Sequence, residues 1–199
     1  MPRHDISDKL THFTSPRENW QEACGRLAGI LEARTIRAGD GNVRGGHTCV
    51  CFTEAPLASL PGRLVNPDNY SRYAPFGIIL EKAWLFERGG RPVIYQTPAE
   101  YGELPSSHQW RHVRYEPAAQ PPIDFSWERE WRIRGDVVFQ PNDISIVVPT
   151  QEWADNLRDY HEWREDMQVE MYSMMIDQDI AHQYREEFPW RVQILDQRQ

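Results

Sequence analysis

The chain changes character at Thr150, and this change limits how it can fold. Before Thr150, short apolar runs rich in β-branched and aromatic side chains alternate with segments that contain Gly or Pro, a pattern typical of short strands joined by turns. Residues 151–187 are polar and aromatic with almost no helix breaker, which predicts one long helix or two shorter ones. We therefore expect a sheet in the first three quarters of the chain and helices at its end.

These runs give the predicted elements. One helix is expected early, because Ser15 and Pro16 are typical N-cap and first-turn residues and apolar side chains follow at helical spacing from Trp20 to Leu31. The predicted strands are residues 10–13, 47–53, 76–80, 92–96, 111–115, 125–133, 144–148 and 191–195. The predicted fold class is α+β, with a mostly antiparallel β core, an N-terminal helix and a C-terminal helical layer. A chain of 199 residues fits one domain, so we expect a core in residues 1–150 and a helical extension of the same domain in residues 151–199.

Charge limits the classes of partner. The chain has 22 Lys and Arg against 30 Asp and Glu, a formal net charge of -8. This balance argues against a surface that coats DNA or anionic lipid, whereas a local basic cleft is compatible with it. Nearly all basic residues are arginines, since Lys9 and Lys82 are the only lysines, and arginine binds phosphate and carboxylate groups with two hydrogen bonds. Without an apolar leader or a membrane-length apolar run, a cytoplasmic protein that does not contact the membrane is expected.

Common cofactor motifs are absent from the sequence. Cys24, Cys49 and Cys51 lack CxxC spacing and there is no HExxH pair, so no metal site is expected. The phosphate-binding patterns GxxxxGKS and GxxxxGKT are missing as well. The Gly39-Asp40-Gly41 segment lacks the third glycine of a dinucleotide-binding fingerprint, so we interpret it as a loop.

The candidates for chemistry are three separated segments, residues 11–14, 50–57 and 127–133. Each of them also has a purely structural interpretation. His12 can be a half-buried strand histidine whose nitrogens bond to the backbone. Thr53 and Glu54 can cap a following helix. Glu128 and Glu130 can belong to a surface network of ion pairs with neighbouring arginines.

The third segment favours chemistry most strongly. If residues 125–133 alternate as a strand, Glu128 and Glu130 lie on one face, while Trp127 and Trp131 lie on the other. Two carboxylates are then held beside each other in an aromatic setting.

The order and spacing of the three segments resemble the ADP-ribosyltransferase superfamily. In that superfamily an early strand offers His or Arg, a middle strand carries a Ser, Thr or Tyr motif, and a late strand begins with a catalytic Glu, often as Glu-x-Glu. The matching positions here are His12, the region of Phe52 and Thr53, and Glu128-x-Glu130. The opening THFTS, followed by GILEARTIRAG, resembles the DarT-like branch. The segments CFTEAPLASL and EREWRI are even more similar to the AbiGi-type family, which is linked to abortive infection.

This resemblance implies a split β core of the ADP-ribosyltransferase type and an enzyme that uses NAD as co-substrate without a metal. Glu130 would be the catalytic carboxylate that orients the ribose of NAD, and Glu128 would position the acceptor nucleophile or receive its proton. The residues implied to bind NAD are His12, Phe13, Thr14, Thr53, Tyr70 and Tyr73. The DarT-like branch also has an arginine shortly after its middle strand. This chain has Glu54 and Ala55 there, with Arg63 and Arg72 only farther along, so the contacts to the NAD phosphates stay unassigned.

Two functions are left open by the sequence. An active enzyme would serve phage defence or a toxin-antitoxin system and would modify an acceptor that the sequence does not identify. A non-catalytic member of the fold would act as a protein-binding antitoxin or regulator. Its partner would contact the acidic C-terminal part, whose aromatic residues are Trp153, Tyr160, Trp163, Tyr172, Tyr184 and Trp190.

Overall fold

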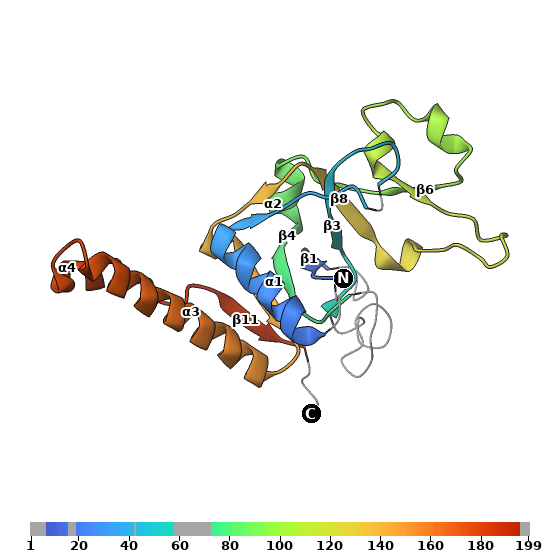
Figure 1. Cartoon of the computed structure of the whole chain (residues 1–199). Coiled ribbons are helices and arrows are strands. Elements are labelled where there is room, and N and C mark those ends of the chain that lie inside the picture. Colours follow the sequence, from blue (N-terminus) through green and yellow to red (C-terminus); the bar gives the residue numbers. More distant parts are fainter. Residues whose placement is uncertain (1–6, 16–18, 42, 58–72, 196–199) are drawn as a thin grey trace.

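A seven-stranded sheet forms the centre of the molecule (Figure 1). The computed structural model describes residues 7–15, 19–41, 43–57 and 73–195. The strand order is β11 (Arg191–Ile194), β10 (Ile144–Val148), β4 (Gly77–Glu81), β1 (Lys9–Phe13), β3 (Cys49–Thr53), β8 (Glu130–Arg134) and β5 (Arg91–Pro92). All neighbours in this sheet are antiparallel except β10 and β11. The predicted α+β class with a mostly antiparallel core is therefore confirmed.

Smaller elements surround this sheet. Two short ladders pair β2 (Thr35–Ile36) with β9 (Val137–Val138), and β6 (Ile94–Gln96) with β7 (His112–Arg114). The α-helices are α1 (Trp20–Ala33), α2 (Lys82–Glu87), α3 (Gln151–Ser173) and α4 (Gln178–His182). Single 3-10 turns occur at Glu100–Glu103, Gln109–Arg111, Ser126–Glu128 and Pro141–Asp143. In the described part of the chain, no helix combines the length and the apolar content needed to cross a membrane.

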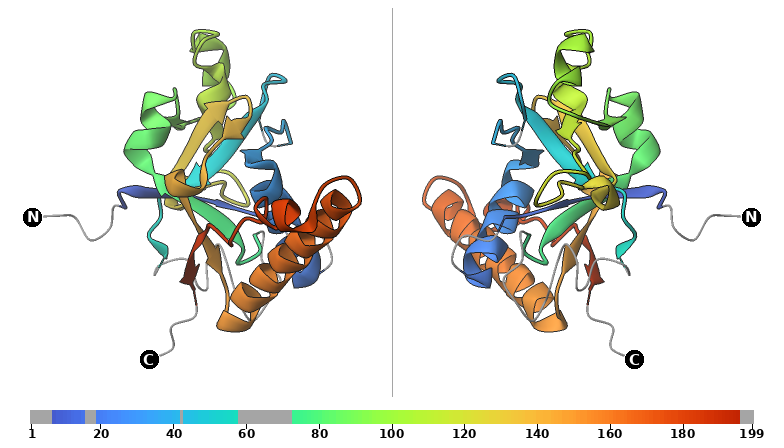
Figure 2. Two further views of the ribbon diagram at one scale, coloured as in Figure 1. Left: turned by 90° about the vertical axis from the view of Figure 1, so that its left-hand side faces the viewer. Right: turned by 90° about the vertical axis from the view of Figure 1, so that its right-hand side faces the viewer.

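The main core lies between one face of the sheet and the helices α1 and α3, which Figure 2 shows on the same side of the sheet. Alternate strand residues supply the sheet side of this core, and α1 and α3 each supply a buried stripe at helical spacing. Its members include Leu10, Val50, Phe52, Ile78, Leu80, Ile144, Ile146, Leu27, Leu31, Ala154 and Leu157. The predicted N-terminal helix and C-terminal helical layer are both present, and β11 returns the chain to the same sheet.

Helix α1 begins later than predicted. Its N-cap is Asn19, whose side chain accepts a hydrogen bond from the backbone N–H of Glu22, and the first helical residue is Trp20. An N-cap at Ser15 is therefore wrong. Asparagine is as good an N-cap as serine, because both offer a short side-chain oxygen to the free N–H groups of the first turn.

The predicted strand at residues 125–133 is correct only in its second half. Asp124 accepts hydrogen bonds from both the backbone N–H and the hydroxyl of Ser126, and this local turn starts a 3-10 helix that ends at Glu128. Arg129 then adopts the left-handed conformation, with φ 45°, and β8 begins at Glu130. Glu128 and Glu130 are consequently not two residues of one strand face, as the alternation had indicated.

The sheet is weakly joined between β1 and β3. Only the pair Thr11 and Thr53 is in register there, whereas β1 with β4 and β3 with β8 are each paired over five residues. Beyond Thr11 on β1, and before Thr53 on β3, the two strands diverge, and the side chain of His12 bonds to the backbone of Cys51 across the gap. We call this place the β1–β3 seam, and it positions the candidate site.

Candidate functional site

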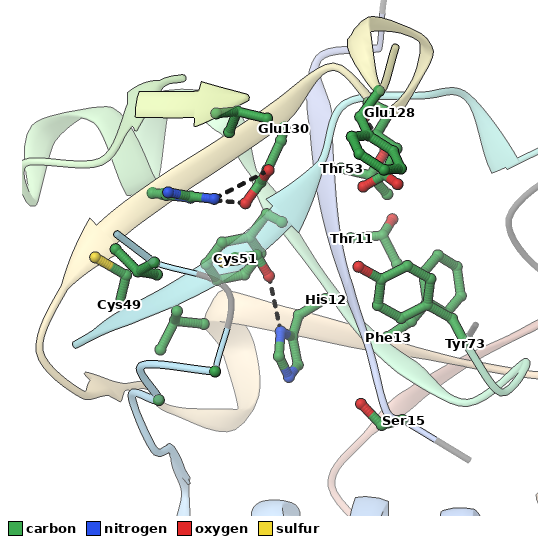
Figure 3. A pocket seen from close by; sticks show the side chains of 18 of the residues that line it. Thr11, His12, Phe13, Ser15, Cys49, Cys51, Thr53, Tyr73, Glu128 and Glu130 are labelled. Atoms are coloured by element: carbon green, nitrogen blue, oxygen red, sulfur yellow. Dashed lines mark hydrogen bonds and ion pairs between the residues drawn. The ribbon is translucent and has the colours of Figure 1, made fainter. Parts of the chain in front are cut away.

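A cleft of about 920 Å³ opens at the β1–β3 seam (Figure 3). Val50 and Phe52 of β3 belong to the main core, so the alternate residues Cys49, Cys51 and Thr53 point to the opposite face. That face, together with Glu130 and Arg132 of β8, forms one wall of the cleft. The volume falls in the range of about 300–1,000 Å³ that is usual for ligand and cofactor sites.

Other walls come from segments that are distant in sequence. Residues 37–44 contribute through the glycine loop before β3, and residues 98–125 contribute through a long excursion between β6 and β8. None of the described residues that line this cleft lies beyond Arg132, so α3, α4 and β11 take no part in it.

His12 lies at the seam, and one nitrogen of its imidazole ring already makes a hydrogen bond. Its Nδ1 lies 2.8 Å from the carbonyl oxygen of Cys51. Because a carbonyl only accepts, Nδ1 must carry the hydrogen, which leaves Nε2 of the neutral ring as an acceptor. Burial lowers the pKa of His12 below its ordinary value of 6.5, and the hydrogen bond to Cys51 opposes this effect in part. A neutral His12 can therefore accept a hydrogen bond from a hydroxyl group in the cleft.

Glu130 is held by Arg132, two residues further along β8. Nε of Arg132 is 2.7 Å from one carboxylate oxygen of Glu130, and a terminal nitrogen of Arg132 is 3.4 Å from the other. Arg132 is itself buried and also donates to the carbonyls of Trp110 and His112 at 3.1 and 3.0 Å. These bonds fix the direction of the Glu130 carboxylate. They also attach β8 to the segment of residues 98–125, which forms another wall of the cleft.

Glu128 lies in the same cleft but belongs to a 3-10 turn, whereas Glu130 belongs to a strand. Its carbonyl accepts a 2.6 Å hydrogen bond from the hydroxyl of Thr53, which in turn accepts one from the backbone N–H of Ala55. The Glu128 side chain is buried at the cleft beside Thr53 and Thr11 (Figure 3). The two predicted carboxylates thus meet in one cleft, but a turn brings Glu128 there and a strand brings Glu130.

The remaining predicted residues divide into three groups. Phe13 and Tyr73 line the cleft together with His12 and Thr53. Thr14 does not line it, because its side chain is buried and donates a 3.1 Å hydrogen bond to the carbonyl of Phe76. Tyr70, Arg63 and Arg72 lie outside the described residues. Thr53 is in the cleft, but its hydroxyl donates a hydrogen bond to the backbone carbonyl of Glu128.

Cysteine thiols in and near the cleft are poor nucleophiles. Burial raises the pKa of the Cys51 thiol, and the nearby Glu130 carboxylate raises it further. Burial also raises the pKa of Cys49, and it raises that of Cys24 to about 11. Since only the thiolate is reactive, these three residues act as small side chains at neutral pH.

Arginines on the cleft walls were missed by the sequence analysis. Arg26 comes from α1, while Arg37 and Arg44 come from the segment between β2 and β3. Arg44 donates to the carbonyl of Pro98 and stacks on the ring of Tyr101. Among the described residues, neither Arg26 nor Arg37 has an ion-pair partner. Their signal in the sequence was weak, because each is a single arginine in an otherwise ordinary segment.

Chemically, the cleft places carboxylates at the seam and guanidinium groups on other walls. Such an arrangement suits a ligand that carries both a positive and a negative part. No cluster of three or more metal-ligating side chains occurs in the described ranges. No protein-family model, curated protein or solved structure matches this chain. The residues of the cleft are therefore the basis for assigning a function.

Proposed function

We propose that this protein is an ADP-ribosyltransferase that binds NAD in the cleft and transfers ADP-ribose from it. The observation that carries the proposal is that His12, Glu128 and Glu130, far apart in sequence, line one cleft together. These residues are the ones through which the sequence resembles the superfamily. A mostly antiparallel sheet that opens beside the site supports a split core of the ADP-ribosyltransferase type.

Charge in the cleft matches the charge of NAD. The nicotinamide ring is cationic and its ribose gains positive charge as the ring leaves, which suits the side of Glu128 and Glu130. The diphosphate is anionic and suits Arg26 and Arg37. These two arginines would supply the phosphate contacts that the sequence left unassigned.

In the proposed reaction the bond between the ribose C1′ and the nicotinamide nitrogen breaks, and its electron pair leaves with the now neutral ring. Glu130 stabilises the oxocarbenium-like carbon and holds the ribose hydroxyl, in the fixed direction that Arg132 gives it. An acceptor nucleophile then attacks C1′ and passes its proton to Glu128. His12 accepts a hydrogen bond from the other ribose through Nε2.

The test compares two glutamates in similar surroundings. The protein is incubated with NAD, and released nicotinamide and modified acceptor are measured by chromatography and mass spectrometry. Glu130→Gln keeps the side-chain volume and removes the charge, so we expect nicotinamide release to fall at least about a hundredfold. Glu54→Gln is the control, because Glu54 is equally buried and paired with Lys82 at 2.9 Å but does not line the cleft.

Both variants should unfold at similar temperatures, whereas only Glu130→Gln should lose turnover. Equal nicotinamide release by wild type and Glu130→Gln would refute the role of Glu130. Absence of both release and NAD binding in the wild type would instead favour the second candidate function, a non-catalytic binding protein of the same fold. That candidate is supported by the engagement of both Glu130 oxygens by Arg132.

A further inference from the structure

Helix α3 carries an apolar stripe that faces away from the core. The stripe consists of Tyr160, Trp163, Met167, Met171 and Met174, spaced three or four residues apart. Between 43% (Tyr160) and 78% (Met174) of each side chain's surface is exposed. Large side chains at this spacing normally form the buried face of a helix. We call this surface the methionine stripe.

The core does not use the methionine stripe. The opposite face of α3 buries Ala154, Leu157 and Val169 against the rest of the molecule. The far end of α3, with α4, extends beyond the sheet as an arm (Figure 1). Around the turn after α3, exposure continues with Met175, Ile176 and Ile180. So many exposed large apolar side chains on one helix and the turn after it are unusual on a protein without a partner.

A ridge of acidic side chains runs beside the methionine stripe. The ridge consists of Asp155, Asp159, Glu162, Asp166 and Glu170, again spaced three or four residues apart, and all five are exposed. Helical geometry places this ridge along one flank of the stripe. Asp155 pairs with Arg158 and Asp166 with Arg185, while the other three form no ion pair with a described residue.

A second copy of this chain fits the surface poorly. In an antiparallel two-fold pair the same flank of each helix meets itself, so the two acidic ridges would face each other. In a parallel pair each ridge would meet the opposite flank, whose one arginine, Arg164, is already bonded to Glu32. Like charges would oppose the antiparallel arrangement, and the parallel arrangement would leave the acidic ridges without free basic partners.

We infer that the methionine stripe is the docking surface for another protein that offers an amphipathic helix with a basic flank. The apolar face of that helix covers the stripe, and its lysines or arginines lie along the acidic ridge. Methionine side chains are flexible and polarisable, so such a surface accepts leucine or aromatic side chains of various shapes. Because α3 does not line the cleft, this inference is independent of the proposed NAD chemistry.

The experiment uses the full chain and two labelled synthetic helical peptides with the same leucine face. One peptide carries lysines on its flanks and the other carries glutamates, and binding is measured by fluorescence anisotropy at low and high salt. We expect the lysine peptide to bind, less tightly at high salt, and the glutamate peptide not to bind. The double variant Trp163→Ser with Met167→Ser should weaken binding at least about tenfold.

Controls separate the surface from general charge effects. Val138→Ser removes an equally exposed apolar side chain on β9, so this variant should bind the lysine peptide like the wild type. Glu162→Gln with Glu170→Gln should weaken binding and reduce its dependence on salt. Equal binding by the Trp163 and Met167 double variant would overturn the inference, and so would no binding by the wild type. A wild-type dimer in light scattering that dissociates in that variant would assign the surface to a second copy instead.

Discussion

At the scale of single residues, the two interpretations of His12 are compatible in the structure. Its Nδ1–H satisfies the Cys51 carbonyl where the ladder between β1 and β3 stops, which is the structural role. Its Nε2 is left as an acceptor toward the cleft, which is the role needed for a ligand. A histidine that bonds to the backbone and a histidine that binds a ligand are thus not exclusive interpretations.

The lowered pKa of His12 gives a prediction on stability and pH. The unfolded chain binds a proton at His12 near pH 6.5, but the folded chain resists this proton because burial disfavours the charged ring. The stability that comes from a neutral His12 is therefore complete above about pH 6.5 and is lost as the pH falls below that value. His12→Asn keeps a donor near the Nδ1 position and does not titrate.

We expect wild type to lose free energy of unfolding faster than His12→Asn between about pH 8 and pH 5.5, as measured by urea unfolding. The two proteins differ only at this position, so the difference between the two curves reports on His12. Parallel curves would show that the folded protein accepts the proton as readily as the unfolded chain.

At the scale of elements, local signals predicted most strands and the helices, but not how they meet. β10 coincides with its predicted range because four of the five residues of Ile144–Val148 are β-branched. The strand predicted at residues 125–133 failed because the Asp124 and Ser126 turn was not recognised, although an Asp two residues before a Ser is a turn signal. The β1–β3 seam and the gathering of Arg26 with Arg37 depend on contacts between distant residues, which no local pattern records.

Gly77 shows how closely two elements approach next to the site. A Cβ atom at this position would lie 2.5 Å from the backbone oxygen of His12 on the neighbouring strand β1. Gly77→Ala must therefore push β1 away, and we expect the free energy of unfolding to fall by about 1–3 kcal/mol. Gly102→Ala is the matched control, since nothing lies within 4 Å of its Cβ, and its change should stay within about 0.5 kcal/mol. Equal stability of the two variants in denaturant titrations would contradict the close approach.

At the scale of the whole molecule, charge is separated between two surfaces. Seven acidic residues and only two arginines lie on α3, while five arginines line the cleft against two glutamates. The cleft is therefore basic although the whole chain has a net charge of -8. Composition alone excluded a broadly basic surface, but only the fold shows where the arginines gather.

This separation predicts how NAD binding depends on salt. In Arg26→Gln with Arg37→Gln, we expect the KM for NAD to rise about tenfold with little change in kcat, because these side chains would hold the diphosphate rather than the reacting carbon. Added salt should raise the KM of the wild type more than that of the variant. Arg88→Gln is the control, because Arg88 stacks on Trp84 and does not line the cleft. An unchanged KM in the double variant would remove these arginines from the NAD site.

The single registered pair at the β1–β3 seam divides the sheet into two ladders that are each fully paired. On one side β1 is paired along its full length with β4, and on the other side β3 is paired along its full length with β8. A change in the angle between the two ladders at Thr11 and Thr53 would change the width of the opening. Such a change would also stretch the bond between the His12 ring and the Cys51 carbonyl, which joins the two diverging strands.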